Sequence, residues 1–176
     1  EFLEILSQET ERLNKVVNNF LSFARPAKPD LLPCKIDEII EPVIKLLKPE
    51  FEKNDISIEK EIEKGLPEIS GDAQQLQQVF LNISLNAIQA MPDGGNLYVS
   101  IKKIEPYIKI DFRDTGAGIS KENLEKLFTP FFTTKKEGNG IGLAISYRII
   151  ENHRGKISVE SELNRGSGFS VKLPYL

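Results

Sequence analysis

The chain has 176 residues, of which 40% are hydrophobic and 28% charged, and its formal net charge is −3 at pH 7. This composition is typical of a soluble protein with one sizeable core and an appendage. The mild acidity gives no reason to expect nucleic acid or an anionic membrane as a partner, and no apolar run reaches the roughly 18 residues of a membrane span. A single cysteine, Cys34, excludes an internal disulfide, and we expect a reducing, cytoplasmic location.

The first 25 residues are predicted to form an amphipathic helix. Their apolar residues recur at alternating spacings of four and three, with one interruption: Phe2, Leu6, Leu13, Val16, Phe20 and Phe23. Such a stripe is typical of a two-helix or four-helix seam, and a surface helix packed on its own domain is the alternative. The prolines of "RPAKP" end the helix, so residues 26–35 are predicted to be a linker. Because the sequence opens without a methionine inside this pattern, we expect it to be a piece of a longer protein.

Residues 36–176 are predicted to form a second domain, which begins with a helix over residues 37–53. Asp37 is the expected N-cap of this helix, because its side chain can accept a hydrogen bond from the first turn. Pro42 lies inside the pattern and is expected to kink the helix or to delay its start. Residues 56–62 alternate apolar and polar side chains, which predicts a half-exposed strand.

The strongest helix pattern covers residues 72–90, where Asp72 and Gln75 have the spacing of a capping box. The turn "PDGG" follows this helix. The remaining elements are expected, in chain order, as two strands at 97–104 and 107–113, a short helix at 121–128, a loop at 129–140, a helix at 141–152, and strands at 156–161 and 168–173. Strands with helices between them, two tight hairpins and no regular strand-helix-strand repeat predict an α+β fold, a two-layer sandwich.

The helix over residues 72–90 carries a stripe of amide side chains. They are spaced by three, four, four and three residues, so they share one face: Gln75, Gln78, Asn82, Asn86 and Gln89. The other faces are mostly apolar, which predicts a buried helix whose amides line a wet cleft or a ligand. Amide oxygens are hard, neutral acceptors that can ligate a magnesium ion shared with phosphates. The alternative is a solvent-facing stripe on a surface helix.

Two glycine-rich segments suggest a nucleotide. In "DTGAGIS", residues 114–120, a carboxylate stands beside two glycines, which permit a close backbone approach to a flat ligand. An aspartate there can accept a hydrogen bond from an exocyclic amine such as that of adenine. "GNGIGLA", residues 138–144, opens a helix, where free N–H groups favour phosphate. Either segment alone is also explained by turns, and neither matches a P-loop or a dinucleotide fingerprint.

In combination these segments resemble sensor histidine kinases. "NISLNA", "DTGAGI", "LFTPFFTTK" and "GNGIGLAI" are similar to the N, G1, F and G2 boxes of that family, in the same order. "HRGKISVESELNRGSGFSVKLP" is similar to its closing segment. Residues 1–25, with "NNFLSFARP", resemble the second helix of the dimerisation and histidine-phosphotransfer hairpin. The sequences "PFFTTK" and "NAIQAM" are most similar to those of the nitrogen-regulation type of sensor kinase.

The resemblance implies a Bergerat ATP-binding fold over residues 36–176, with a mostly antiparallel sheet against helices. It implies ATP and Mg²⁺ as cofactors. Asn86 would ligate the metal, Asn82 would act at the phosphates or the metal, and Lys135 would reach the phosphates from a mobile lid. Asp114 would take the adenine amine. The other implied nucleotide-binding positions are Gln89, Gly116, Gly118, Ile119, Phe131, Phe132, Thr133, Thr134, Gly138, Asn139, Gly140, Ile141, Gly142, Leu143 and Ser167.

Within that set, the resemblance implies distinct tasks. The two phenylalanines would anchor the lid, and the glycines after it would let backbone amides meet the triphosphate. Ile141 and Leu143 would pack beneath the phosphates, and the hydroxyl of Ser167 would lie near the adenine. Three positions depart from the family pattern. Asn139 stands where threonine is common, Gln89 where many relatives carry lysine, and Asn164 where the third glycine box often begins with glycine.

The implied function is that of a protein-histidine kinase domain. It would transfer the γ-phosphate of ATP to a histidine on the hairpin of a homodimer, for relay to a response regulator. No phosphoacceptor motif precedes Glu1, and the only histidine, His153, is expected to be structural, for example as a helix cap. We therefore expect no self-phosphorylation by this chain. Two alternatives remain open: an ATPase of the gyrase, Hsp90 and MutL type, which has a glutamate where Asn82 stands, and a binding module without activity.

Overall fold

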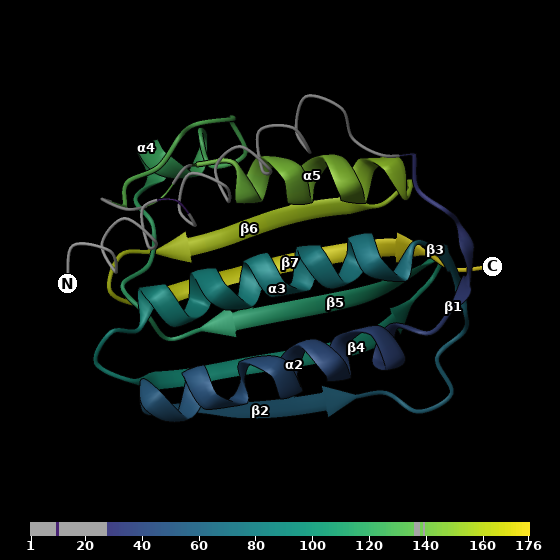
Figure 1. Ribbon diagram of the computed structural model, residues 1–176, viewed down its shortest axis with the longest axis horizontal. Helices are drawn as coiled ribbons and strands as arrows, with labels where there is room; N and C mark the ends of the chain where they lie inside the picture. The colour runs from purple at the N-terminus through teal and green to yellow at the C-terminus, as the bar shows by residue number, and fades with distance from the viewer. Residues whose placement is uncertain (1–9, 11–27, 136–137, 139) are drawn as a thin grey trace.

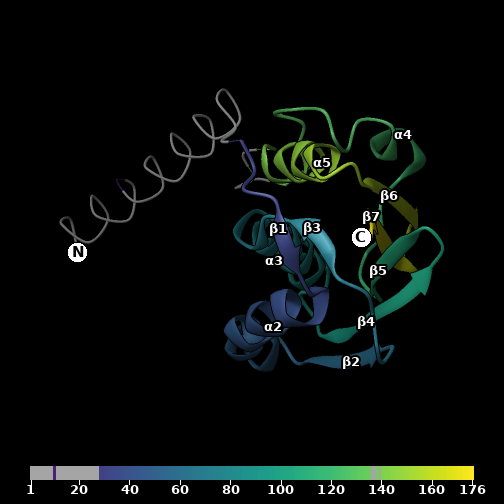
Figure 2. The same ribbon diagram turned by 90° about the vertical axis from the view of Figure 1, so that its right-hand side faces the viewer.

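The computed structural model of the chain describes residue 10 and residues 28–135, 138 and 140–176. The helix predicted over residues 1–25, the first two residues of the predicted linker and Asn139 therefore lie outside the described residues, apart from Thr10. The described part forms two layers, with helices against one face of a five-stranded sheet (Figures 1 and 2). This is the α+β sandwich that the sequence predicts. Among the described residues, no helix combines the length and apolar character needed to cross a membrane.

The main sheet has the strand order β2-β4-β5-β7-β6. β2 pairs in parallel with β4, and the other neighbours are antiparallel. The bounds in that order are β2 (Ile56–Ile62), β4 (Gly95–Ile104), β5 (Tyr107–Asp114), β7 (Gly166–Pro174) and β6 (Lys156–Glu162). All five strands were predicted, because each is long enough to show alternation of apolar and polar side chains or lies beside a clear turn.

A second, two-stranded sheet was not predicted. It pairs β1 (Leu32–Cys34) with β3 (Ile69–Gly71) in antiparallel register. Strands of three residues are too short to show a period of two, so their sequences read as loop. β1 comes from the segment 26–35 that was predicted to be the linker, and with β3 it lies at one end of the two layers (Figure 1).

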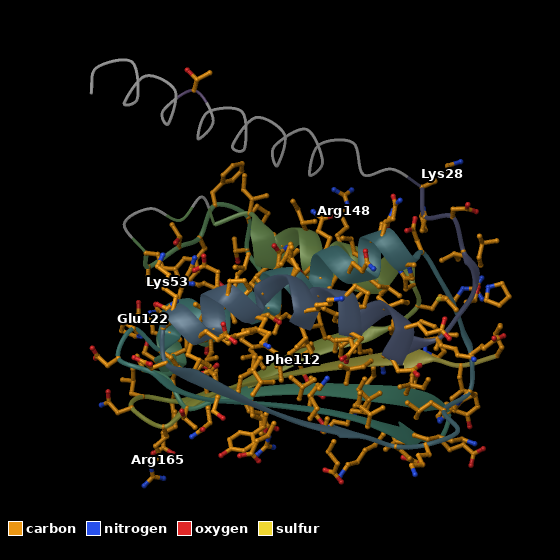
Figure 3. The ribbon with its side chains drawn as sticks, turned by 60° about the horizontal axis from the view of Figure 1, so that its bottom comes forward. Lys28, Lys53, Phe112, Glu122, Arg148 and Arg165 are labelled. Atoms are coloured by element: carbon orange, nitrogen blue, oxygen red, sulfur yellow. The ribbon has the colours of Figure 1, made fainter. Side chains whose placement is uncertain are left out.

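Among the described residues, three helices cover the sheet. α3 (Ala73–Ala90) lies over its centre and contacts both α2 (Ile36–Lys53) and α5 (Gly142–Asn152) (Figure 1). The core lies between the layers, where the rings of Phe80 on α3 and Phe112 on β5 have centroids 5.8 Å apart. Figure 3 shows Phe112 in this position. Burying side chains of this size stabilises the fold by about 1.5–3 kcal/mol each.

The predictions for the ends of two helices were wrong. α2 begins at Ile36, its N-cap is Lys35, and no side chain caps it; Asp37 already lies in the first turn. Pro42 does not delay the start, because a continuous buried face holds the helix against the core: Ile36, Ile39, Ile40, Val43, Leu47 and Phe51. The helix expected over residues 121–128 is shorter, since only α4 (Lys121–Leu124) is α-helical and turns follow it.

A hydrogen-bonded junction joins the start of α3 to the end of α5. As predicted, Asp72 caps α3, and its Oδ1 accepts from the N–H groups of Gln74 and Gln75 at 3.0 and 3.1 Å. The N–H of Asp72 donates to Nε2 of His153 at 2.9 Å, and Nδ1 of His153 lies 2.7 Å from the carbonyl oxygen of Ile149. Because Nε2 accepts, Nδ1 must carry the proton that is donated to Ile149. The buried His153 is therefore a cap of α5, as predicted, and also a bridge to α3.

We predict that His153→Ala lowers the free energy of unfolding by about 2–4 kcal/mol, because it removes a buried ring and leaves the N–H of Asp72 without its partner. Urea denaturation would measure the change. Asn152→Ala, at an exposed position one residue earlier, is the matched control and is expected to change the free energy by less than about 0.5 kcal/mol. Equal stabilities of the two variants would contradict the bridging role.

Because of Asp72, we also expect the free energy of unfolding to depend on pH. Partial burial opposes its charged form, but hydrogen bonds from Gln75, Asp30 and Gln74 outweigh this and lower the pKa of Asp72 below its usual 3.8. The resulting stabilisation is complete above the unfolded-state pKa and is lost as the pH falls through the lower folded-state pKa. Asp72→Asn keeps an acceptor at Oδ1 but loses this contribution. Its deficit in unfolding free energy, measured by urea denaturation over a range of pH, should be constant above about pH 5 and shrink in stronger acid.

Candidate functional site

A cavity of about 770 Å³ opens beside the C-terminal half of α3. Its size falls within the usual range for small-molecule sites. Most of the residues that the resemblance singles out line it: Asn82, Asn86, Gln89, Asp114, Gly118, Ile119, Phe132, Thr133, Thr134, Lys135, Gly138, Gly140, Gly142, Leu143 and Ser167. Gly116, Phe131 and Ile141 do not line the cavity, although they belong to the segments that enclose it. The fold thus gathers side chains from α3, the loop after β5, the loop before α5, and β7.

The amide stripe of α3 divides at the cavity. Asn82, Asn86 and Gln89 line it, whereas Gln75 and Gln78, nearer the start of the helix, do not. Nδ2 of Asn82 donates to the carbonyl oxygen of Gly142 at 3.1 Å and contacts Oγ of Ser146 at 3.2 Å. Only the C-terminal three amides of the predicted stripe therefore form a cavity wall, and Asn82 ties this wall to the first turn of α5.

Lys135 lines the cavity and its side chain reaches α3. Its Nζ donates to Oδ1 of Asn86 at 2.7 Å and to Oε1 of Gln89 at 2.5 Å. Although the residue as a whole is exposed, desolvation of its ammonium lowers the pKa of Lys135, and the negative charge of Asp114 opposes that shift. The oxygen of Asn86 therefore already faces a cation in this structure.

Asp114 lines the cavity where β5 ends. It is 7% exposed, and its Oδ1 accepts from the N–H groups of Gly116 at 2.9 Å and Ser167 at 3.2 Å. Burial raises the pKa of Asp114 above the usual 3.8, against the opposing effect of these hydrogen bonds and of the charge of Lys135. An ionised carboxylate only accepts hydrogen bonds, so Asp114 presents an acceptor to any ligand in the cavity.

The loop after β5 is pressed between α3 and the turn that joins β6 to β7. Ala117 donates its N–H to the carbonyl oxygen of Ala90 at 2.9 Å, and a Cβ at Gly116 would clash with that same carbonyl. Gly118 has a φ of +70°, and a Cβ there would clash with the carbonyl of Glu162. Both glycines are thus required by close packing, and of the two only Gly118 borders the cavity.

The described part of the loop before α5 closes on itself. The N–H of Phe131 donates to the carbonyl oxygen of Gly140 at 3.0 Å, which joins the two ends of the loop. Oγ1 of Thr133 accepts from the N–H of Lys135 at 3.1 Å. Phe132 lines the cavity, whereas the side chain of Phe131 is exposed. Ile141 is buried beneath the start of α5, next to the cavity-lining Leu143.

The donor set of the cavity is compatible with magnesium. Within the described residues, no group of three or more histidine, cysteine or acidic side chains could enclose a metal ion. A neutral amide oxygen such as that of Asn86, which already accepts from an ammonium, suits a magnesium ion that keeps several waters and shares phosphate oxygens.

Several contributors to the site were not predicted from the sequence. Asn123 and Leu127 line the cavity, and their spacing of four residues within the predicted helix 121–128 was a usable signal. Phe169 on β7 also lines it. Ser161 does not line the cavity but forms hydrogen bonds with Ile119 and Ser167, which do, and no local pattern distinguishes it from Ser158, the other serine of β6.

Known proteins are similar to this chain in both sequence and fold. Residues 71–176 match the family described as "Histidine kinase-, DNA gyrase B-, and HSP90-like ATPase". Sporulation kinase E of Bacillus subtilis (strain 168) is 36% identical over 174 residues, which are 98% of this chain and 24% of that protein. Sensor histidine kinase ZraS of Escherichia coli (strain K12) is also 36% identical over 174 residues, which are 99% of this chain and 37% of that protein. The chain thus spans well under half the length of these relatives.

Two solved structures extend the likeness to three dimensions. Full-length ShkA in complex with AMPPNP has a TM-score of 0.88 at 26% identity, covering 99% of this chain and 38% of that one. Histidine kinase ThkA in complex with response regulator protein TrrA has a TM-score of 0.83 at 26% identity, covering 99% of this chain and 51% of that one. The sequence match, the fold and the cavity agree: the chain belongs to the histidine kinase-, DNA gyrase B- and HSP90-like ATPase family, as a domain of its histidine kinase branch.

Proposed function

We propose that this chain binds Mg²⁺-ATP in the cavity and is the catalytic domain of a protein-histidine kinase. The observation that carries the proposal is the polarity of the cavity. One part of the lining presents the amides of Asn82, Asn86 and Gln89 with the ammonium of Lys135, and another, where β5 ends, presents the buried carboxylate of Asp114. The first part suits a triphosphate and its cation, and the second suits a hydrogen-bond-donating base.

The roles of the residues follow from this orientation. Asp114 and Ser167 accept from the adenine, and Gly118 and Ile119 border the base. The glycines at 138, 140 and 142 lie where the start of α5 offers backbone N–H groups to phosphates. Asn86 holds the magnesium ion, which neutralises phosphate charge when bound. Lys135 moves from Asn86 and Gln89 onto the phosphates and orders the loop around them.

Phosphoryl transfer, rather than hydrolysis, is the proposed reaction. In phosphoryl transfer, positioning and charge neutralisation supply most of the catalysis, and Asn82, Asn86 and Lys135 provide both. Hydrolysis by the gyrase and Hsp90 branch uses a glutamate as the base for water. The amide of Asn82 has no basic group, and its nitrogen is engaged with α5.

The acceptor is proposed to be a histidine on a dimerisation hairpin, with relay to the receiver domain of a response regulator. The presence of TrrA in the ThkA structure supports a regulator as partner. The heptad spacing of residues 1–25 supports a homodimer. The sequences "PFFTTK" and "NAIQAM" support the nitrogen-regulation subtype. A cytoplasmic location agrees with the use of ATP. His153 is held by two hydrogen bonds away from the cavity lining, so it is not the acceptor.

One experiment tests both steps. The chain is titrated with ATP, with and without Mg²⁺, and is then incubated with labelled ATP and a separate protein that carries an intact hairpin. We expect magnesium-dependent binding, an acid-labile phosphate on the hairpin histidine and no label on this chain. Absence of ATP binding would refute the whole proposal. Binding without transfer to any hairpin would refute the kinase assignment, and labelling of this chain that is lost in His153→Ala would refute the role of that histidine.

A further inference from the structure

We infer that Ser161, which lies outside the cavity, fixes the direction of the hydrogen bond made by Ser167 and so makes the base end of the cavity select a purine with a 6-amino group. The inference deepens the proposed function and rests on it. It concerns specificity, because Ser161 is a positioning residue that acts through Ser167.

The hydroxyl of Ser161 joins three segments that enclose the base end. Ser161 lies on β6, and its Oγ accepts a hydrogen bond from the N–H of Ile119 at 2.8 Å. The same atom lies 2.8 Å from the carbonyl oxygen of Gly166 and 3.0 Å from Oγ of Ser167. A loop that lines the cavity is thereby tied to the first residues of β7.

The chemistry of these partners sets the direction of each bond. A peptide N–H only donates and a carbonyl oxygen only accepts, whereas a hydroxyl has one proton and two lone pairs. The single proton of Ser161 is therefore the one donated to the carbonyl oxygen of Gly166, which cannot donate in return. The remaining contact, between Ser161 and Ser167, must then use the proton of Ser167.

This assignment decides what the ligand meets. With its proton directed at Ser161, the hydroxyl of Ser167 presents only lone pairs to the cavity that it lines. The neighbouring acceptor is Asp114, whose Oδ1 is held 3.2 Å from the N–H of Ser167. A 6-amino group has two protons to offer these acceptors. A 6-oxo group would place its oxygen against them without a donor, which is unfavourable in a buried site.

The test compares ATP with ITP, which carries a 6-oxo group. In Ser161→Ala, the hydroxyl of Ser167 is released and can turn to donate to the 6-oxo group. The affinity for ITP relative to ATP should then rise by about three- to tenfold, the equivalent of one neutral hydrogen bond. Ser161→Thr keeps the hydroxyl and should retain the ratio of the unaltered chain. Ser158→Ala, an exposed serine on the same strand, is the matched control and should also retain it.

A double variant separates this effect from simple loosening of the loop. Because the gain requires the hydroxyl of Ser167, Ser161→Ala should not raise the ITP-to-ATP ratio when Ser167→Ala is already present. An unchanged ratio in folded Ser161→Ala, or a rise that persists in the Ser167→Ala background, would overturn the inference.

A second measurement applies if Ser161→Ala does not fold. In the otherwise unaltered chain, Ser167→Ala should weaken ATP by about threefold or more and leave the triphosphate of purine riboside, which has no 6-substituent, unaffected. Equal weakening of both would overturn the assigned direction. Failure of the unaltered chain to bind ATP would be a different result, because it would refute the proposed function itself.

Discussion

Asp114→Asn is expected to reverse the base preference of the cavity. The variant keeps an acceptor for the N–H groups of Gly116 and Ser167, but an amide nitrogen replaces one carboxylate oxygen and donates where Asp114 accepts. The adenine amine then faces a donor, and we expect ATP affinity to fall roughly 10- to 100-fold, as for loss of a hydrogen bond to a charged group. Titrations with ATP and ITP would measure the reversal. Similar losses for both nucleotides would contradict a role in base recognition.

The same variant should not lose stability. Burial raises the pKa of Asp114 above 3.8, so the folded chain holds a proton there more tightly than the unfolded chain. The ionised carboxylate therefore reduces stability above the folded-state pKa, and acidification through that pKa relieves the penalty. We expect Asp114→Asn to melt at the same temperature as the unaltered chain or higher at pH 7, with the difference shrinking in acid. For the same reason, when the pH is lowered, the ATP affinity of the unaltered chain should begin to fall at a higher pH than it would with an aspartate of ordinary pKa.

Asn86→Ala is expected to remove the magnesium-dependent part of ATP binding. Its oxygen is the cation-facing acceptor at the phosphate end, where Lys135 now donates to it. We expect the affinity measured with Mg²⁺ to fall at least about tenfold, or 1.4 kcal/mol, and the affinity measured with a chelator to change little. Calorimetric titration under both conditions would show the difference.

The control for Asn86 lies on the same helix. Gln78 belongs to the same amide stripe but does not line the cavity, so Gln78→Ala should leave both affinities unchanged. If Asn86→Ala weakened binding equally with and without the metal, the residue would shape the cavity rather than hold a cation.

Local patterns were enough for the framework of this protein. Three features depend on residues only a few positions apart, and all three were predicted. They are the half-exposed strand β2, the cap that Asp72 forms on α3, and the contact of the α3 amides Asn82, Asn86 and Gln89 with a cavity. Predictions were wrong where local preference met tertiary packing. Pro42 disfavours helix, yet the buried face of α2 keeps it helical on both sides of that residue. β1 and β3 were missed because three residues show no period.

The sequence by itself determined the order of the boxes, the two-layer fold and the chemical types of the candidate ligands, because these depend on residue identity and short-range spacing. Only the tertiary structure decided which groups meet. Lys135 reaches Asn86 across 49 residues of sequence, His153 holds Asp72 across 81, and Ser161 orients a serine on the neighbouring strand. The physical reason is that a hydrogen-bond partner is chosen by the packing of whole elements. Helix and strand periodicities show which face is buried, but they do not show what lies opposite that face.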